Sequence, residues 1–299
     1  MDGKNWPGGY RAGRGRRLTN IRYADDIMVY ATSLGELTMM LEMLTVELRI
    51  IGIELNQNKT NIFTTVAMQQ ATVVEVAGEF VDILYGQAVH KYLGQKLPGQ
   101  LSQRGRVELS HRFQNAWWKF NEHRDTLVDQ DISVASRLEL FEAVVTPTVL
   151  FGLSSCPLTK QQVQSIDALQ RRMLRSIVGW RRVSDEHWSE TMRRMRDRVD
   201  HALHVFPVKN WSTQFYCRKF RFVNSMVRKP EAWPAKAICW SPPLTNSQAR
   251  RSRGRPPRRW DDDLIAFASV QFPGENWYEV ANDTPRWLSH EQAYIDSLS

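Results

Sequence analysis

Short β-prone runs fill the first part of the chain, and helical periodicity replaces them further along. Residues 18–23 and 27–31 are apolar-rich runs on either side of Ala24-Asp25-Asp26. Two such runs separated by a gap of turn size predict a tight β-hairpin. Both carboxylates, those of Asp25 and Asp26, are then expected at the hairpin tip.

The segment after this hairpin predicts a helix that is largely buried. Ser33 and Glu36 have the spacing of a capping box, and Gly52 supplies a stop signal. Between them, apolar residues recur at helical spacing: Leu37, Met40, Leu41, Leu44, Leu48 and Ile51. We expect this helix to pack on the sheet that carries the two aspartates.

More short strands are expected before the pattern becomes helical. Residues 53–56 and 58–63 favour a strand–turn–strand unit, and residues 72–76 and 80–84 predict a second hairpin. From Leu101 onward the apolar positions follow helical spacing, over residues 107–120, 132–145, 159–179, 184–199 and 211–227. Pro147 is expected to end the second of these helices.

The sequence therefore predicts an α+β fold, in which a small antiparallel sheet with a packed helix precedes a mostly α-helical region. The expected divisions are residues 1–17 (a flexible basic arm or the start of a strand), 18–100, 101–240, 241–259 (a Pro/Arg-rich linker) and 260–299 (short helices). In the last division, Asp261-Asp262-Asp263 is interpreted as the capped start of a helix rather than as a metal site. Trp277 and Trp287 are expected to anchor the tail by packing.

Composition narrows the class of protein. A hydrophobic content of 42% with 24% charged residues is typical of a globular chain. The formal net charge of +8 favours polyanionic partners. Cys156, Cys217 and Cys239 are scattered, so neither a disulfide framework nor a zinc site is indicated. No long apolar run or signal-like N-terminus is evident, so we expect an intracellular protein without a membrane partner.

Arginines gather on the polar faces of the predicted helices and in the linker. The candidate nucleic-acid-binding residues are Arg171, Arg172, Arg175, Arg250, Arg251, Arg253, Arg255, Arg258 and Arg259. Phosphate contacts dominate nucleic-acid affinity, so the sum of these faces indicates a nucleic-acid partner. The alternative for any single helix is an ordinary solvated amphipathic surface. The linker also has the composition of a nuclear-localisation patch, which adds the nucleus to the expected location.

The stretch Tyr23-Ala24-Asp25-Asp26 resembles the catalytic-core motif of reverse transcriptases. Residues 18–22 before it are similar to the version found in non-LTR (LINE-like) retrotransposons. Residues 254–262, with the sequence Gly-Arg-Pro-Pro-Arg-Arg-Trp-Asp-Asp, are similar to a segment near the C-terminus of LINE-like polyproteins. The resemblance implies a partial palm over residues 18–100 and a thumb-like helical region over residues 101–240.

The resemblance also implies roles for individual residues. Asp25 and Asp26 correspond to catalytic ligands of Mg²⁺ or Mn²⁺ in a two-metal nucleotidyl transfer, and Lys59 to a proton donor toward the leaving pyrophosphate. Tyr92, Leu93 and Gly94 resemble the primer-grip turn. The implied partners are an RNA template, a DNA primer and deoxynucleoside triphosphates.

In the family a further palm aspartate lies upstream of the hairpin, together with the fingers. Only seventeen residues precede Leu18, and Asp2 is no credible substitute. We therefore expect a C-terminal fragment of the polymerase that is inactive by itself. Two alternatives stay open: a non-catalytic, basic nucleic-acid-binding remnant, and an unstable product that exposes apolar surface and aggregates.

Overall fold

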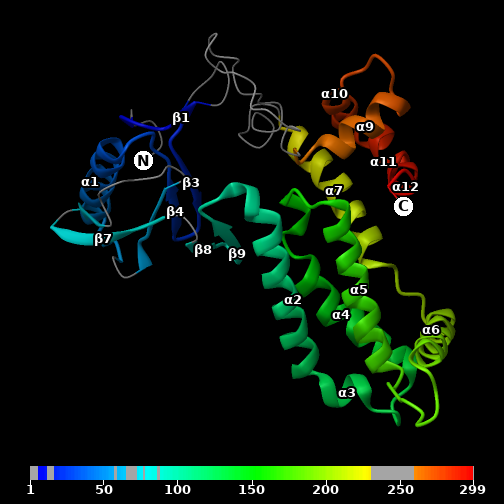
Figure 1. Ribbon diagram of the computed structural model, residues 1–299. Coiled ribbons are helices and arrows are strands. Elements are labelled where there is room, and N and C mark those ends of the chain that lie inside the picture. Colours follow the sequence, from blue (N-terminus) through cyan, green and yellow to red (C-terminus); the bar gives the residue numbers. More distant parts are fainter. Residues whose placement is uncertain are drawn as a thin grey trace. The chain divides into compact units, whose positions relative to one another are not determined.

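The computed structural model describes residues 6–11, 17–56, 59–64, 73–76, 78–85, 88–229 and 259–298. The chain divides into two compact units. Unit 1 comprises Met1–His90, Pro98–Leu101 and Met226–Pro257, and unit 2 comprises Lys91–Leu97, Ser102–Ser225 and Arg258–Ser299. Strands and one long helix make up most of unit 1, and helices make up most of unit 2 (Figure 1). The predicted α+β fold is confirmed.

The predicted aspartate hairpin is present in unit 1. Strand β3 (Asn20–Tyr23) pairs antiparallel with β4 (Asp26–Val29), with Tyr23 opposite Asp26. Only Ala24 and Asp25 form the turn. The end of the basic arm contributes a strand, because β1 (Tyr10–Arg11) pairs antiparallel with β2 (Arg17–Leu18) just before the hairpin.

Helix α1 (Leu34–Ile50) follows at the predicted place, but the expectation that it is largely buried is wrong, since only one face is buried. Its capping box is only half formed. The Oγ of Ser33 accepts from the backbone N–H of Glu36 at 3.2 Å. The Glu36 carboxylate accepts instead from the backbone and hydroxyl of Thr32, at 2.9 and 2.7 Å. Gly8 lies close to α1, where a side chain would not fit: a Cβ at this position would lie 2.8 Å from the Sδ of Met40.

A three-stranded sheet completes the core of unit 1. Its order is β5 (Ile62–Phe63), β7 (Glu79–Leu84) and β6 (Val73–Val76). The predicted hairpin of β6 and β7 is confirmed, and β5 runs parallel to β7. The predicted strand over residues 53–56 is wrong: the N–H of Ile53 donates to the carbonyl of Leu48 and so closes the end of α1.

The buried apolar face of α1 packs on this three-stranded sheet. One hydrophobic cluster joins Leu41 of α1 to the strand residues Ile62, Val76, Val81 and Ile83. The aspartate hairpin forms a separate two-stranded sheet. The expectation that α1 packs on the sheet carrying the aspartates is therefore wrong, because the larger apolar face belongs to the other sheet.

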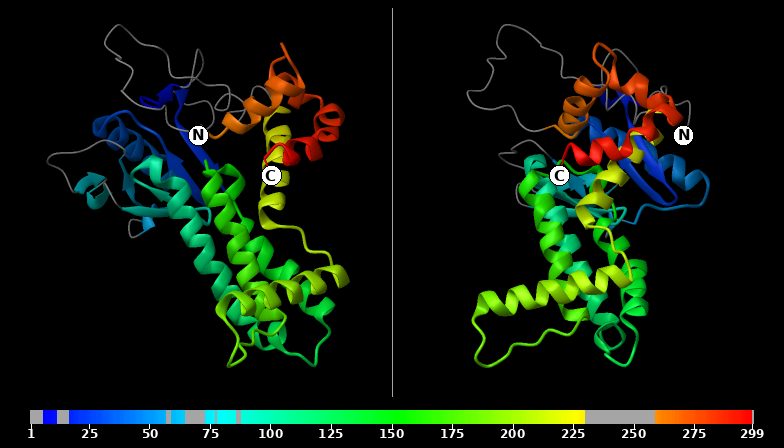
Figure 2. Two further views of the ribbon diagram at one scale, coloured as in Figure 1. Left: turned by 45° about the vertical axis from the view of Figure 1, so that its right-hand side comes forward. Right: turned by 90° about the vertical axis from the view of Figure 1, so that its right-hand side faces the viewer.

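Unit 2 is built on helices. It also includes Lys91–Leu97, which form most of a hairpin of β8 (Val89–Tyr92) and β9 (Gln95–Pro98). The short 3-10 turn η2 (Leu101–Gln103) precedes its first helix. Its helices are α2 (Arg104–Glu122), α3 (Arg124–Val128), α4 (Val134–Leu150), α5 (Lys160–Ile177), α6 (Trp188–Val205) and α7 (Trp211–Val227). Both views of Figure 2 show α2, α4 and α5 running alongside one another. The Thr159–Gln162 capping box of α5 is confirmed.

Helix α4 does not end at Pro147, contrary to prediction. It continues to Leu150 because Val149 and Leu150 are buried, while Pro147 lies in the last turn with its ring exposed.

Together with η3 (Leu153–Ser155), helix α4 is long and apolar enough, by length and composition, to cross a membrane. The expectation that the chain has no such run is therefore wrong. Leu138, Phe141 and Val145 are fully buried inside unit 2, as in a core helix.

The C-terminal helices pack on α7. They are α9 (Asp262–Gln271), α10 (Trp277–Asn282), α11 (Thr284–Ser289) and α12 (Glu291–Asp296). Trp287 is fully buried and stacks on Phe220 of α7, with ring centroids 4.2 Å apart. Trp277 is also buried, so both predicted anchors are confirmed.

Capping does not explain the acids that open α9. Asp261 stands at the N-cap without a side-chain bond to the helix backbone, and it pairs with Arg259 at 3.2 Å. Asp263 is buried and pairs with Lys219 of α7. The interpretation of the triplet as a helix cap is therefore wrong for these two residues. Asp261 makes no side-chain bond to the helix backbone, and Asp263 accepts from the N–H of Leu264 at 3.0 Å but is paired with Lys219 of another helix.

Candidate functional site

The tip of the β3–β4 hairpin displays Asp25 and Asp26. Both side chains are exposed, Asp25 in the turn and Asp26 as the first residue of β4. Ala24 adopts a left-handed conformation with φ of 52°. That conformation disfavours any residue with a Cβ by about 1–2 kcal/mol and is usually taken by Gly at the start of a hairpin turn. Strained backbone of this kind is concentrated at functional sites, so the tip is a candidate site.

The two carboxylates suit a hard divalent cation. In the described part of the chain, neither Asp25 nor Asp26 pairs with a cationic side chain. Mg²⁺ is commonly held by one or two carboxylates together with water and substrate phosphates, so this donor set fits. No group of three or more His, Cys, Asp or Glu residues comes together among the described residues. Within that part, the hairpin would therefore contribute two protein ligands and no more.

Lys59 lies in unit 1 on the segment between α1 and β5. Its side chain is exposed, and a tight turn presents it, in which the N–H groups of Lys59 and Thr60 donate to the carbonyl of Asn56 at 3.1 and 3.0 Å. No carboxylate of the described residues forms an ion pair with it. An exposed, unpaired ammonium is free to meet a phosphate.

The turn at Tyr92-Leu93-Gly94 belongs to unit 2 and joins β8 to β9. Leu93 and Gly94 both have positive φ, 47° and 77°, as in a two-residue type I′ turn. The carbonyl of Gly94 accepts from the guanidinium of Arg112, and the N–H of Lys96 donates to Glu108 at 2.5 Å. Glu108 and Arg112 are themselves paired at 2.5 Å and buried in α2. This pair fixes the turn onto α2.

The predicted arginine face of α5 is open. Arg171 and Arg172 are exposed and Arg175 is half-buried, and none of them pairs with a carboxylate of the described residues. The guanidinium carbon of Arg172 lies 5.2 Å from the ring centroid of Trp117 in α2. The chain has no Asp or Glu between Asp167 and Asp185. As far as the structure describes the chain, the second half of α5 therefore carries a positive surface without a paired carboxylate.

Other cations of the helical region, and one of the predicted linker arginines, form ion pairs within the protein. Arg221 of α7 pairs with Glu291 at 2.6 Å, and Lys219 with Asp263 at 2.6 Å, so these cations of α7 serve packing. Arg259 is exposed and pairs with Asp261. The remaining linker residues, Arg250, Arg251, Arg253, Arg255 and Arg258, lie outside the described residues.

The sequence interpretation missed two features. The Glu108–Arg112 pair has i,i+4 helical spacing, which is visible in the sequence, but its burial is not. Trp180 and Trp188 approach each other across the loop between α5 and α6, with ring centroids 5.9 Å apart. Their spacing along the chain gives no signal for that contact.

Comparison with known proteins gives one informative similarity. The chain is 25% identical over 286 residues to a putative uncharacterized transposon-derived protein of Caenorhabditis elegans. The chain is related to a transposon-derived protein. The match covers 92% of this chain and 95% of that relative, so it includes both units. No family model and no solved structure matches the chain.

Proposed function

We propose that this chain is part of the RNA-directed DNA polymerase of a non-LTR retrotransposon. The observation that carries the proposal is the hairpin tip, where Ala24 in a left-handed conformation holds two exposed aspartates that pair with no cation of the described residues. The transposon-derived relative supports the same ancestry. The motif order along the chain, from the aspartates through Lys59 to the turn at residues 92–94, is that of reverse transcriptases.

In this proposal each element has a defined role. Asp25 and Asp26 bind Mg²⁺ or Mn²⁺, which when bound would stabilise the attacking oxygen and the leaving group. Lys59 neutralises the departing phosphate and donates a proton to it. The turn at residues 92–94 contacts the primer. Two-metal transfer requires a further carboxylate beyond those that the described residues bring together, so the proposal expects no polymerase activity from the described site by itself.

Metal binding at the hairpin is directly testable. Mn²⁺ at millimolar concentration should broaden the NMR signals of residues 24–27, and the Asp25→Asn/Asp26→Asn variant should lose the effect. Asp82→Asn is the matched control, because Asp82 is an exposed acid on β7 outside the hairpin. Equal broadening in all three proteins would reject the site.

Polymerisation is the second test. The chain alone should not extend a DNA primer on an RNA template with Mg²⁺ or Mn²⁺. Robust extension that is abolished by Asp25→Asn would contradict the inference that the site is incomplete.

A second candidate function is nucleic-acid binding without catalysis, carried by the arginines of α5 that pair with no carboxylate in the described part of the chain. It predicts binding whose affinity falls steeply as salt rises. Replacing Arg171, Arg172 and Arg175 by Gln should weaken binding and flatten the salt slope, whereas Asp25→Asn should change neither. Arg221→Gln is the matched control, since Arg221 is held by Glu291.

A further inference from the structure

Two exposed tryptophans form a pair beside the positive surface of α5. Trp180 follows the end of α5 and is 43% exposed, and Trp188 begins α6 and is 55% exposed. Their ring centroids are 5.9 Å apart and their planes are inclined at 56°. About half of each tryptophan therefore stays in water although the two rings lie beside each other.

The loop that carries this pair is fixed by other residues. Arg194 donates to the carbonyl of Arg181 at 2.7 Å and to both carboxylate oxygens of Glu186, at 2.9 and 2.7 Å. Arg198 donates to the carbonyl of Val178 at 2.5 Å. These bonds hold the backbone on both sides of Trp180 without using either ring. The indoles are therefore not needed to shape the loop.

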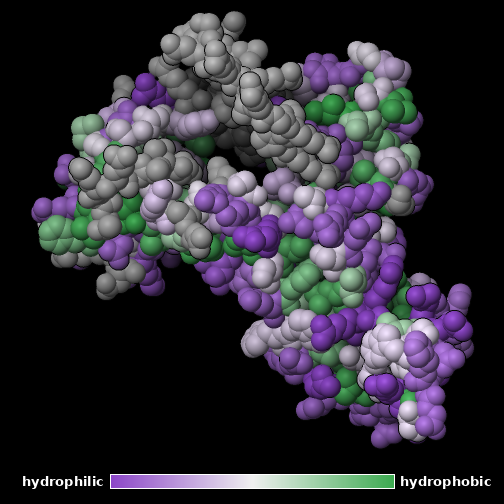
Figure 3. Space-filling model, viewed as in Figure 1, coloured by the Kyte–Doolittle hydropathy of each residue, from purple (hydrophilic) through white to green (hydrophobic). Residues whose placement is uncertain are grey.

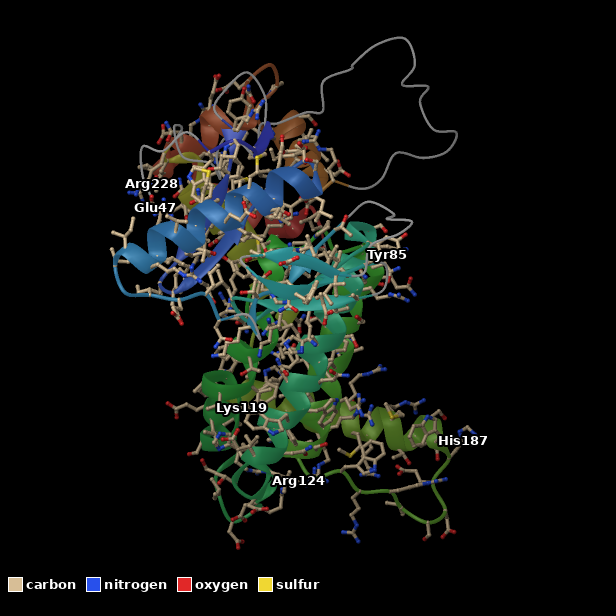
Figure 4. All side chains as sticks on the ribbon, turned by 90° about the vertical axis from the view of Figure 1, so that its left-hand side faces the viewer. Glu47, Tyr85, Lys119, Arg124, His187 and Arg228 are labelled. Atoms are coloured by element: carbon tan, nitrogen blue, oxygen red, sulfur yellow. The ribbon has the colours of Figure 1, made fainter. Side chains whose placement is uncertain are left out.

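Two exposed arginines and an exposed aspartate lie near the pair in the chain. Arg181 and Arg182 are exposed and pair with no carboxylate of the described residues. Of the nearby acids, Glu186 is bound by Arg194 and Thr191, and Glu190 accepts from the backbone of His187. Asp185 is exposed. The surface over α6 and the loop before it is mostly hydrophilic in Figure 3, and Figure 4 shows His187 at the outer end of α6.

We propose that Trp180 and Trp188 stack on unpaired bases of a single-stranded nucleic acid, whose phosphates meet Arg181 and Arg182. Aromatic faces beside a positive track are how proteins bind single strands with little sequence preference. Bases in a duplex are already stacked, so this site selects single strands over duplexes. The inference rests on the proposed nucleic-acid binding and assigns a substrate class to one part of it.

Fluorescence anisotropy with three labelled probes tests the assignment: a 20-nucleotide oligo(U) RNA, oligo(dT) of the same length and an RNA duplex. Trp180→Ala/Trp188→Ala should weaken binding of both single strands by about ten-fold or more, and binding of the duplex by less than about two-fold. Trp180→Phe/Trp188→Phe should retain most of the affinity because it keeps the aromatic faces. Phe80→Ala is the matched control, since Phe80 is an aromatic residue of β7 that is 73% exposed.

The outcomes separate this inference from the proposed function. The stacking site alone would be overturned if the alanine double variant bound single strands as well as the unmodified protein does. In that case binding would still be lost when Arg171, Arg172 and Arg175 become Gln. An equal loss for single strands and duplex would also overturn it. Salt-independent or absent binding of every probe by the unmodified protein would overturn both. Loss of single-strand binding in the alanine double variant, together with retained binding in the phenylalanine double variant, supports the site. Similar losses of affinity for oligo(U) and oligo(dT) show that the site does not distinguish ribose from deoxyribose.

Discussion

The Nζ of Lys219 lies 2.6 Å from Oδ1 and 2.8 Å from Oδ2 of Asp263, so a buried ion pair joins α7 to α9. The same ammonium donates to the carbonyl of Trp260 at 2.6 Å, and the hydroxyl of Tyr294 donates to Oδ2 at 3.1 Å. Both members of the pair are buried. The C-terminal helices are thus fixed to α7 by charge as well as by aromatic packing.

Removing one member of this pair should destabilise unit 2 strongly. Lys219→Met leaves the Asp263 carboxylate buried without its cation, a change that typically costs about 3–5 kcal/mol. Chemical denaturation followed by tryptophan fluorescence measures the loss. The double variant Lys219→Met/Asp263→Leu should lose less than the sum of the single variants, because it removes the unpaired charge.

An ion pair formed by an exposed arginine of the same helix is the matched control. Arg221 pairs with Glu291, but 66% of the Arg221 side chain is exposed. Arg221→Gln should therefore reduce the free energy of unfolding by about 1 kcal/mol or less. A Lys219→Met variant as stable as Arg221→Gln would contradict the importance of the buried pair.

A second prediction concerns the turn at residues 92–94. Arg112 is buried, holds the Gly94 carbonyl, pairs with Glu108 and lies 4.8 Å from the ring centroid of Phe151. Arg112→Met should release the turn and leave Glu108 buried and unpaired, with a loss of stability of about 3 kcal/mol. Faster amide hydrogen exchange at Lys96, whose N–H is bound by Glu108, should report the release.

The matched control for this prediction is Lys119→Gln, which removes a surface pair with Glu122 on the same helix. It should leave exchange at Lys96 unchanged. Slow exchange at Lys96 in Arg112→Met would show that the turn does not depend on the buried pair.

The bounds of helix α7 could be predicted from the sequence, but its tertiary contacts could not. Its span follows from the spacing of apolar residues, and the structure agrees with the predicted range of 211–227. Its first turn is bound by Asp167 of α5, whose carboxylate accepts from the N–H and the hydroxyl of Ser212 at 2.8 and 2.6 Å. Those partners are 45 positions apart, and no local pattern connects them.

The candidate site also combines local features that the sequence predicts with tertiary contacts that it does not. The hairpin with its two aspartates is a local structure, so flanking apolar runs and a short polar gap predict it. The pairing of β5 with β7 and the contact of Trp180 with Trp188 depend on tertiary packing, which the periodicity of a single segment does not contain. The buried role of Asp263 was missed for the same reason: an acid at a helix start has an adequate local explanation.

A third prediction tests the strain at the hairpin tip. Gly tolerates the φ of 52° found at Ala24, whereas a β-branched residue does not. Ala24→Gly should therefore stabilise the hairpin by up to about 1 kcal/mol, and Ala24→Val should destabilise it by more than that. Amide exchange at Tyr30, whose N–H donates to the carbonyl of Thr19 at the base of the hairpin, measures both effects. The opposite order of the two variants would show that Ala24 is not strained.

A fourth prediction follows from Glu186 in the loop before α6. Hydrogen bonds from Arg194, then from Thr191, lower the pKa of Glu186 to about 2. The pKa of a glutamate in an unfolded chain is about 4.3, so the folded-state value is depressed. The contribution of Glu186 to holding the loop is then fully present above about pH 4.3 and is lost as the pH falls through about 2.

Trp180 and Trp188 flank Glu186 in the sequence, so their spectra can report the protonation of Glu186. Their near-UV circular dichroism should change as the pH falls from about 4.3 towards 2, because protonated Glu186 no longer binds Arg194 as an ion pair. Glu186→Gln should show the altered signal already at neutral pH and lose this transition. Glu122→Gln is the control, because Glu122 lies at the end of α2 and pairs with Lys119. A transition of equal size in Glu186→Gln would assign it to other carboxylates and would show that Glu186 does not hold the loop.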